Sequence, residues 1–420
     1  MSHPAAFSLT LDPLSTRPRS RTRIQTTPWN ISTNRFREVC ENLAFDYFKW
    51  DLYLGGKCRI LPESIVLSQE THEHLVAITE SFAGLMRRFE ANVRRDRRLL
   101  AELGIEPRLI PLLEAGDADE PSFSRADFFL TPDGRWVLSE FNEDVPGGFN
   151  EAAGLPALLT AAELGGEAAG DLRRCLCAAF AECESVGMVF ATAFSEDLQH
   201  CSVLSRWLRA CGHRTVHASP EHLRHHWAGP RLAGVPIQGV FRFYPGEWFT
   251  LLSNLVDWRR ALPGLYMMNP PARLLSQSKR SFGLWRSGIG LHTADQQLAV
   301  NYCPATESFQ RHRLAYYREH RDQLVLKQAF GRMGDAVLVG ALATPRDWDD
   351  ALMFGMRRPR AVAMQERFLV EPLLFESGFL YPTVGVYAVN GRFAGYYSRV
   401  APQPFITHEA YHVATVIEAA

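Results

Sequence analysis

The sequence predicts a mixed protein, part α+β and part α/β, built from two or three lobes. Its 420 residues are enough to bury a large core in more than one compact unit. Helical patterns dominate from Asn34 to about Leu113, and strands alternate with helices from about Arg174 to Gly264. Two hairpin signals, Asp133-Gly134 and Asn390-Gly391, lie outside these regions. The alternation in the middle of the chain predicts a small open sheet of parallel strands.

Composition argues against several classes of partner. The formal net charge is −1 and 46% of the residues are hydrophobic, so no bulk positive field favours nucleic acid or a membrane surface. No apolar run approaches the roughly 18 residues that a transmembrane helix needs. The eight cysteines lack C-x-x-C spacing, which indicates neither a zinc site nor a disulfide framework. We therefore expect a cytoplasmic protein with reduced thiols.

The first part of the chain combines a polar arm with a helical region. Residues 1–30 are rich in Ser, Thr, Pro and Arg and contain one acid, which predicts a disordered arm. A transit peptide shares that composition, but the stretch has no convincing amphipathic helix. From Ser68 to Gly104, apolar residues recur at helical spacing beside a charged face, and Gly104 provides a stop signal.

The middle of the chain contains the expected parallel unit. Its elements are a strand at 187–194, a helix at 196–212, and strands at 213–219 and 234–245. It lacks G-x-G-x-x-G, so dinucleotide binding is not supported. Arg242 is an unusual cation inside the last strand; it either reaches solvent at the strand end or binds a substrate anion.

Two short alternating runs between Phe123 and Asn142 are joined by Thr-Pro-Asp-Gly. If Asp133 and Gly134 form a two-residue type I′ turn, counting outward fixes the register of the hairpin. The opposed pairs are then Leu130 with Val137, Asp127 with Glu140, and Arg125 with Asn142.

This register places the carboxylates of Asp127 and Glu140 roughly 5 Å apart on one face. Their repulsion is on the order of 3 kcal/mol at an effective dielectric constant near 20, so either one acid is protonated or a cation sits between them. With the Asn142 amide they form an all-oxygen set suited to Mg²⁺. Arg125, on the same face, would then meet an anion that the metal also holds. The alternative is a surface hairpin with an ordinary Arg–Asp ion pair.

Beyond this hairpin, Gly147-Gly148 precedes a predicted helix near Asn150. Free N–H groups at the helix start could cradle an anion, or Asn150 could act as a simple N-cap.

Lysine is scarce in this chain, because only four of its 45 basic residues are lysines: Lys49, Lys57, Lys279 and Lys327. A lysine kept where arginine otherwise serves is a candidate for a role that needs a compact point charge, such as contact with phosphate. Chance is a fair explanation for the first two.

The pattern Arg125-x-Asp127, hairpin, Glu140-x-Asn142, followed by Pro146-Gly147-Gly148, resembles that of the glutathionylspermidine synthase family, which are circularly permuted ATP-grasp ligases. The resemblance implies an ATP-grasp fold with a Rossmann-like pre-ATP-grasp domain, and ATP and Mg²⁺ as cofactors. It also implies that Arg125 binds the γ-phosphate and that Asp127, Glu140 and Asn142 bind the metal.

On this basis the chain divides into five parts. They are the arm at 1–30; the helical region with the metal-binding hairpin at 31–173; the pre-ATP-grasp domain at 174–265; the ATP-binding lobe at 266–372; and C-terminal strands that return to the core at 373–420.

The same resemblance assigns further nucleotide contacts. Lys279 lies in a segment similar to the family's Asn-Pro…Asn-Lys segment, with Ser278 in place of the usual Asn. Lys327 and a loop containing Gly331 and Gly334 would contact the phosphates, although a plain β-hairpin would also explain that pattern. The remaining expected contacts are Gln365 and Glu366 at the hinge near adenine, and Arg399, after which Thr407-His408 stands where the family often has an Asn.

The expected function is an ATP-dependent carboxylate–amine ligase that forms an amide through an acyl phosphate. Its expected partners are small acids and amines, such as amino acids, peptides or polyamines. Two rivals stay open: a small-molecule kinase on the same scaffold, and a nucleotide-binding protein without turnover.

Overall fold

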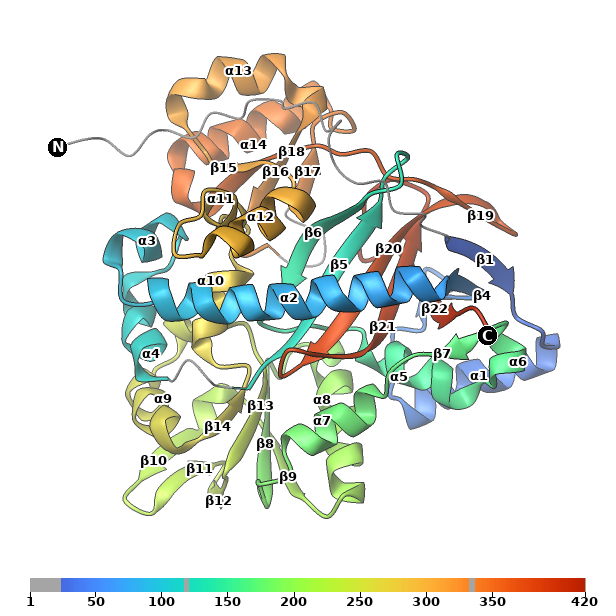
Figure 1. The fold of residues 1–420 in the computed structure, drawn as a ribbon. Helices are drawn as coiled ribbons and strands as arrows, with labels where there is room; N and C mark the ends of the chain where they lie inside the picture. The colour runs from blue at the N-terminus through green and yellow to red at the C-terminus, as the bar shows by residue number, and fades with distance from the viewer. Residues whose placement is uncertain (1–23, 117–120, 332–336, 420) are drawn as a thin grey trace.

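Three larger β-sheets, two small ones and the helices between them form the protein in the computed structural model, which describes residues 24–116, 121–331 and 337–419. The largest sheet has nine strands, seven of them in the order β1-β4-β22-β21-β20-β5-β6. It carries the predicted hairpin at one edge and crosses the centre of the molecule (Figure 1). Its strands are β1 (Ile24–Pro28), β4 (Ile60–Leu67), β5 (Phe123–Leu130), β6 (Trp136–Asn142), β20 (Gly378–Val389), β21 (Arg392–Ala401) and β22 (Tyr411–Ile417), with β7 (Glu167–Ala168) and β19 (Leu373–Phe375) added at the sides.

A long helix, α2 (Gln69–Val93), covers one face of this sheet (Figure 1). Its Phe82 and Phe89 share a hydrophobic core with Ala126 and Phe128 of β5. Side chains alternate between the two faces of a strand, so Arg125 and Asp127 project from the opposite face. Burying the even-numbered residues of β5 beneath α2 therefore orients its charged residues toward the other side of the sheet.

The second sheet is fully parallel, in the order β14-β13-β8-β9. It comprises β8 (Ser185–Phe190), β9 (Arg214–Ala218), β13 (Gly239–Phe243) and β14 (Tyr266–Met268), with α8 (Ser195–Ala210) crossing between β8 and β9. Parallel strands joined by a helix are what the sequence predicted for this segment. The fourth strand, β14, begins just beyond the expected boundary at residue 265, because hydrogen bonding to β13 draws it into this sheet.

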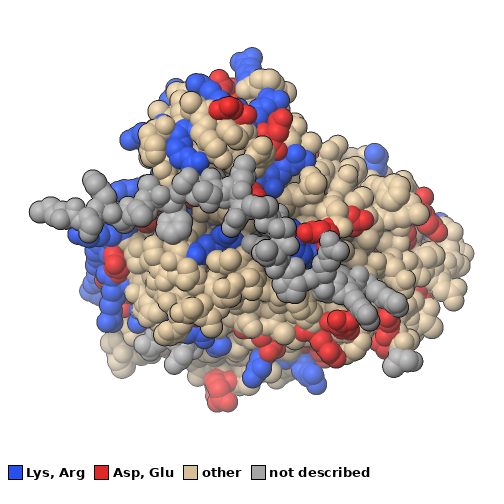
Figure 2. Space-filling model, turned by 45° about the horizontal axis from the view of Figure 1, so that its top comes forward, with Lys and Arg blue, Asp and Glu red and all other residues tan. Residues whose placement is uncertain are grey.

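The third sheet is antiparallel, in the order β15-β18-β16-β17. Its strands are β15 (Thr306–Ser308), β16 (Leu324–Gln328), β17 (Val337–Val339) and β18 (Val362–Glu366), packed against α13 (Leu314–Glu319) and α14 (Pro345–Arg357). Figure 2 shows basic and acidic side chains interspersed over this lobe, in keeping with a net charge near zero.

The remaining elements connect the sheets. They are α1 (Thr33–Asp46), α3 (Arg97–Glu102), α4 (Ile110–Ala115), α5 (Phe149–Leu158), α6 (Ala161–Leu164), α7 (Leu172–Ala179), α9 (Leu255–Ala261), α10 (Leu274–Gln277), α11 (Ser281–Arg286) and α12 (Thr293–Tyr302), with small ribbons β2 (Tyr53–Leu54) and β3 (Lys57–Cys58), and β10 (Leu223–His226), β11 (Gly229–Leu232) and β12 (Val235–Pro236).

Three expectations about the N-terminal part need correction. The predicted arm at 1–30 is ordered from Ile24, because β1 pairs with β4 along its whole length; residues 1–23 lie outside the described chain. Strand β4 interrupts the helical region, since its apolar residues complete the central sheet. The predicted helix at 68–104 breaks at Asp96, whose side chain caps α3 by accepting hydrogen bonds from the N–H groups of Arg98 and Leu99.

Within the described residues, no helix combines the length and the apolarity needed to cross a bilayer.

Arg242 of β13 is buried and serves neither role expected from the sequence. Its side chain is 0% exposed and pairs with Asp144, which is also 0% exposed. The guanidinium also donates to the backbone oxygens of Asn269 and Tyr244. This cation therefore joins the parallel sheet to the segment that follows β6.

We predict that Arg242→Met lowers the free energy of unfolding by about 3–5 kcal/mol, because it removes the cation that neutralises the buried Asp144 carboxylate. Urea unfolding followed by circular dichroism measures the change. Arg214→Met, at an exposed position of the neighbouring β9, serves as the control and should change stability by less than about 0.5 kcal/mol. Equal effects of the two substitutions would contradict the structural role.

Candidate functional site

The β5–β6 hairpin has the predicted register where the charged residues lie, but for a different reason. Asp127 faces Glu140 and Arg125 faces Asn142. The turn, however, is a three-residue loop closed by hydrogen bonds between Thr131 and Arg135, and only Gly134 of the predicted pair has positive φ (79°). This loop shifts the neighbouring register, so Leu130 faces Trp136 and not Val137.

A β-bulge at Ser139 restores the register beyond the turn. Phe128 faces Leu138 and Asp127 faces Glu140, so Ser139 has no opposite residue. A bulge adds one residue to one strand, which cancels the shift made by the longer loop. Two unpredicted features thus place the two carboxylates opposite one another.

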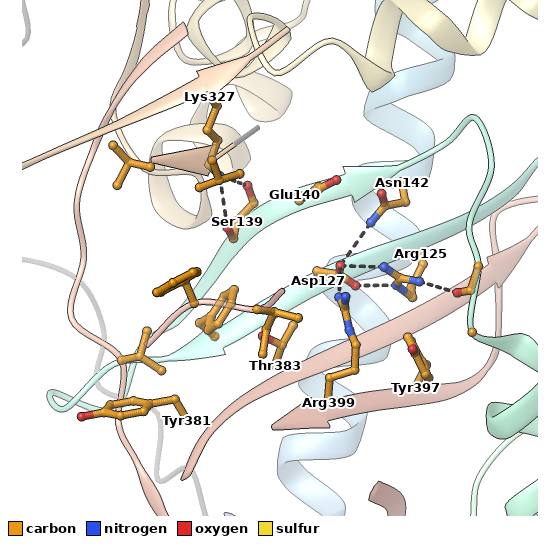
Figure 3. Close-up of a pocket in the computed structure, with 18 of the residues that line it drawn as sticks. Arg125, Asp127, Ser139, Glu140, Asn142, Lys327, Tyr381, Thr383, Tyr397 and Arg399 are labelled. Atoms are coloured by element: carbon orange, nitrogen blue, oxygen red, sulfur yellow. Dashed lines mark hydrogen bonds and ion pairs between the residues drawn. The ribbon is translucent and has the colours of Figure 1, made fainter. Parts of the chain in front are cut away.

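Asp127 lies at the centre of a buried charge network (Figure 3). Its carboxylate accepts two hydrogen bonds from Arg125, at 2.6 and 2.9 Å, and one each from Arg399 (2.8 Å) and Asn142 (3.1 Å). Burial alone would raise the pKa of this carboxyl, but the two guanidinium groups outweigh burial and hold the pKa below its ordinary value. Asp127 is therefore ionised at neutral pH.

The two candidate lysines come from other segments of the chain, and both contact the β5–β6 hairpin. Lys279 Nζ donates to Glu140 Oε1 at 2.6 Å. Lys327 Nζ donates to the backbone oxygen and to the hydroxyl of Ser139, at 3.0 and 3.2 Å. Burial lowers the pKa of Lys327 to about 8, with Lys279 adding to the shift and Glu140 opposing it. Three cations, Arg125, Arg399 and Lys279, thus reach the two carboxylates, and Lys327 binds the hairpin between them.

These contacts revise the electrostatic argument made from the sequence. The two acids do require neutralisation, and in the structure Arg125, Arg399 and Lys279 provide it. Arg125 pairs with Asp127, as in the alternative reading of the hairpin, but the pair is buried and not at the surface. A metal ion is therefore not needed to hold the hairpin together, and the described residues group no three His, Cys, Asp or Glu side chains around a metal position.

The aromatic ring of Tyr397, which the sequence did not single out, packs against both arginines. The Cζ atoms of Arg125 and Arg399 lie 5.0 and 5.3 Å from its centre, within cation–π range. A Cβ at Gly148 would lie 2.3 Å from Tyr397 Cζ, so the backbone here approaches as only glycine permits. Gly148 has φ of 92° and is the N-cap of α5.

The expected anion cradle at Gly147-Gly148 is already occupied by the protein. The Gly148 N–H donates to His200 Nε2 at 2.7 Å, and the Gly147 oxygen accepts from Arg125 and from Tyr387. Asn150 is not the N-cap; its buried amide donates to the backbone oxygens of Tyr47 and Gln199.

A cavity of about 650 Å³ opens beside this network, lined by residues of all three sheets. Of the candidate residues, Lys279 and Glu366 do not line it; Lys279 reaches it through Glu140, and the Glu366 N–H donates to Ala305. Gly331 follows β16 outside the lining, and Gly334 lies outside the described residues. The candidates that do line it are Arg125, Asp127, Glu140, Asn142, Lys327, Gln365 and Arg399.

Several lining residues were missed by the sequence analysis. Thr383 lies opposite Arg399 in the β20–β21 pair. The Thr383 hydroxyl and Arg399 Nε are both buried, and neither has a hydrogen-bond partner in the described part of the chain. Glu196 and Asp197, in the first turn of α8, line another side of the cavity. The sequence of a strand or helix turn does not show which other segment of the protein it will face. No sequence signal therefore identified Thr383, Glu196 or Asp197.

The β20–β21 ribbon that presents Thr383 and Arg399 confirms the second hairpin prediction. Asn390 and Gly391 have φ of 50° and 76°, as a type I′ turn requires. Val389 faces Arg392 directly across the turn.

One solved structure shares the fold of this chain over most of its length. The structure is similar to that of a glutathione synthetase-like effector from Globodera pallida, with 12% identity and a TM-score of 0.61, covering 92% of this chain and 98% of that one. It also matches D-alanyl-alanine synthetase A from Vibrio cholerae, with 14% identity and a TM-score of 0.36, over 55% of this chain and 73% of that one. A search of curated proteins finds no match.

A family model extends over nearly the whole described chain. The model of the glutathionylspermidine synthase preATP-grasp family matches residues 33–418. The expected fold class, an ATP-grasp protein with a Rossmann-like unit and with its acidic hairpin ahead of its lysines, is confirmed. The chain belongs to the glutathionylspermidine synthase preATP-grasp family.

Proposed function

We propose that this protein is an ATP-dependent ligase that joins a carboxylate to an amine through an acyl phosphate. One observation carries the proposal: Asp127, Glu140 and Asn142 share a cavity with Lys327 and stand beside Lys279. Phosphoryl transfer requires positioning and charge neutralisation more than a protein nucleophile, and this cluster consists of charged and amide groups.

The donors around the cavity fit the phosphates of a nucleotide. Lys327 presents a compact charge, and Arg399 Nε and the Thr383 hydroxyl are buried donors without a partner among the described residues. Unsatisfied buried donors are costly, and phosphate oxygens would satisfy them. Apolar side chains on the same side, including Val325 and Val339, form a wall that suits a nucleobase.

The oxygen ligands also fit a magnesium ion. Asp127 Oδ1 and Glu140 Oε1 each accept one hydrogen bond within the described chain, so both carboxylates keep lone pairs for a cation. Together with the Asn142 amide oxygen they would hold Mg²⁺, which prefers oxygen ligands and substrate phosphates. Bound there, the metal would neutralise charge on the phosphate oxygens.

Within this proposal, Arg125 stabilises charge on the transferred phosphoryl group from its fixed position beside Asp127, and Lys279 and Lys327 hold the phosphates. Gln365, which lines the cavity from β18, is the proposed contact near the adenine; Glu366, the next residue, does not line the cavity. Glu196 and Asp197, which line the cavity from the first turn of α8, would attract the ammonium form of the second substrate. Burial raises the pKa of Glu196, so its neighbour Asp197 is the better proposed anion.

The function is tested by measuring ADP release while small acids and amines are supplied singly and in pairs. A ligase releases ADP only when an acid and an amine are both present, and mass spectrometry then finds an amide. Release with one acceptor alone would indicate a kinase. Nucleotide binding with no ADP release from any pair in the screen would indicate a protein without turnover.

We predict that Asp127→Asn reduces kcat/KM by at least about 100-fold, because it removes a metal ligand and the anion that orients two arginines. Asp133→Asn is the matched control, since Asp133 pairs with Arg135 on the same hairpin but is 44% exposed at its turn. The control should retain activity within about twofold. Equal activity of wild type and Asp127→Asn would reject the metal assignment.

We predict that nucleotide binding depends on pH through the protonation of Lys327. Its pKa of about 8 lies below the ordinary lysine value, so the ammonium is lost as pH rises through 8 and affinity for the anion falls. For the same reason, the free protein gains stability between pH 8 and the ordinary lysine pKa, where the unfolded chain still binds the proton. Calorimetric titration of ADP in EDTA should show up to about tenfold weaker binding at high pH. Lys327→Met should bind weakly with a flat profile; a pH-dependent profile in that variant would contradict the assignment.

We predict that Gly148→Ala lowers activity by more than about tenfold, because the added methyl group displaces Tyr397 and its two arginines. Gly212→Ala separates this clash from backbone strain. Gly212 has the same φ of 92°, but nothing lies within 4 Å of the position that a Cβ would take there, so its substitution should lower the melting temperature while leaving kcat/KM unchanged. Similar losses of activity in both variants would show that the contact with Tyr397 is unimportant.

A further inference from the structure

Two of the eight cysteines, Cys40 and Cys58, lie against each other near the start of strand β4 of the central sheet. The Sγ atoms of Cys40 and Cys58 are 3.9 Å apart, and both thiols are free. Cys40 lies on α1 and is 3% exposed, within a core that includes Leu52 and Ile60. Cys58 lies on β3 and is partly exposed. The pair therefore joins a buried residue to a partly exposed one.

The hydrogen bond between the two thiols makes them chemically different. It lowers the pKa of Cys58 to about 7, whereas the pKa of Cys40 is raised by the same bond and by burial. The thiolate is the reactive form of cysteine. Cys58 thus combines the exposure and the ionisation of an attacking thiol, and Cys40 has the position of a resolving thiol.

The backbone around Cys58 allows the two sulfur atoms to approach. A disulfide needs an S–S distance of about 2.05 Å, so the sulfur atoms would have to close most of their separation. Cys58 belongs to a ribbon of two short strands whose ladder pairs with no other strand of the described chain. The ribbon is held at its base, because the oxygen of the next residue, Arg59, accepts a hydrogen bond from the His412 N–H of β22. Its turn, Gly55-Gly56, has nothing within 4 Å of either glycine's Cβ position. The tip of the ribbon is therefore unobstructed, so the ribbon can bend toward α1 about its base at Arg59.

We propose that Cys40 and Cys58 form a reversible disulfide when the protein meets a peroxide. The Cys58 thiolate attacks one peroxide oxygen and becomes a sulfenic acid, while the other oxygen leaves and takes up a proton as water or alcohol. The Cys40 sulfur then attacks the Cys58 sulfur, the S–O bond breaks, and a second water leaves with the Cys40 proton. The two thiols are oxidised together by two electrons, and the peroxide is reduced.

The bridge would close the chain between α1 and β3 into a loop. This loop contacts helices α5 and α8, which each contribute a residue to the cavity lining. Within this loop, Lys49 pairs with Glu151 of α5, and the Trp50 N–H donates to Gln199 of α8 at 3.0 Å. Helices α5 and α8 carry Gly148 and Glu196 to the cavity. Oxidation would therefore restrain the segment that supports these two helices.

The proposal is tested on the full-length reduced protein, treated with hydrogen peroxide, alkylated and digested without reductant. We expect a linked peptide pair containing Cys40 and Cys58, lighter by two hydrogen atoms and separated by dithiothreitol. Cys175, which is partly exposed on α7 and whose pKa is raised by burial, provides the internal reference. Cys58 should be consumed at least about tenfold faster than Cys175. Absence of the linked peptide, or oxidation of Cys175 at the rate of Cys58, overturns the proposal.

Two variants identify the order of attack. Cys40→Ser should leave Cys58 as a sulfenic acid that dimedone traps, whereas Cys58→Ser should leave Cys40 unreacted. Circular dichroism verifies that each variant is folded, and the peptide map of the wild type requires neither variant. The oxidised wild type should melt a few degrees higher than the reduced protein, because the bridge constrains the unfolded chain. The same rise in oxidised Cys40→Ser would contradict the bridge.

Discussion

Neutralisation of the Asp127 carboxylate in a buried position is the constraint on which the candidate site depends. An isolated carboxylate could not remain ionised there, because desolvation disfavours its charged form. Arg125 and Arg399 reach it from two different strands of the central sheet, and Asn142 reaches it from a third. The network therefore forms only when β5, β6 and β21 are in register, and it ties the chemistry of the site to correct assembly of the sheet.

The β5–β6 hairpin is also the place where the other two sheets meet the central one. Lys327 of the antiparallel sheet donates hydrogen bonds to Ser139 at the bulge, so the lobe that carries this proposed phosphate contact is attached to β6. On the other side, Asn269 exchanges hydrogen bonds with both backbone groups of Phe123 at the start of β5. The buried Arg242–Asp144 pair adds a second link to the parallel sheet. Both neighbouring sheets are thus linked by hydrogen bonds or ion pairs to the segment that holds the carboxylates.

The sequence predicted much of this site because its charged residues sit in local patterns. Arg125, Asp127, Glu140 and Asn142 were placed together by period-two alternation and a turn signal. The prediction was right although the turn was wrong, since the three-residue loop and the bulge at Ser139 compensate. Neither feature could be foreseen, because Thr-Pro-Asp-Gly is compatible with more than one loop and a bulge depends on the partner strand. Tyr397, Thr383 and His200 were missed for a related reason: their roles come from residues that are distant in the sequence or lie on other strands.

By itself, the sequence determined the parallel unit, both hairpins, the four residues that share one face of the first hairpin, and the family that they resemble. Periodicity, glycine turns and local spacing carry that information, and all of these act over a few residues. Only the tertiary structure decided which cations neutralise Asp127 and Glu140, that the glycine N–H at α5 is taken by His200, and that Arg242 is a buried link between sheets. These outcomes depend on which surfaces are desolvated against one another, and desolvation is a property of the packed chain and not of any segment alone.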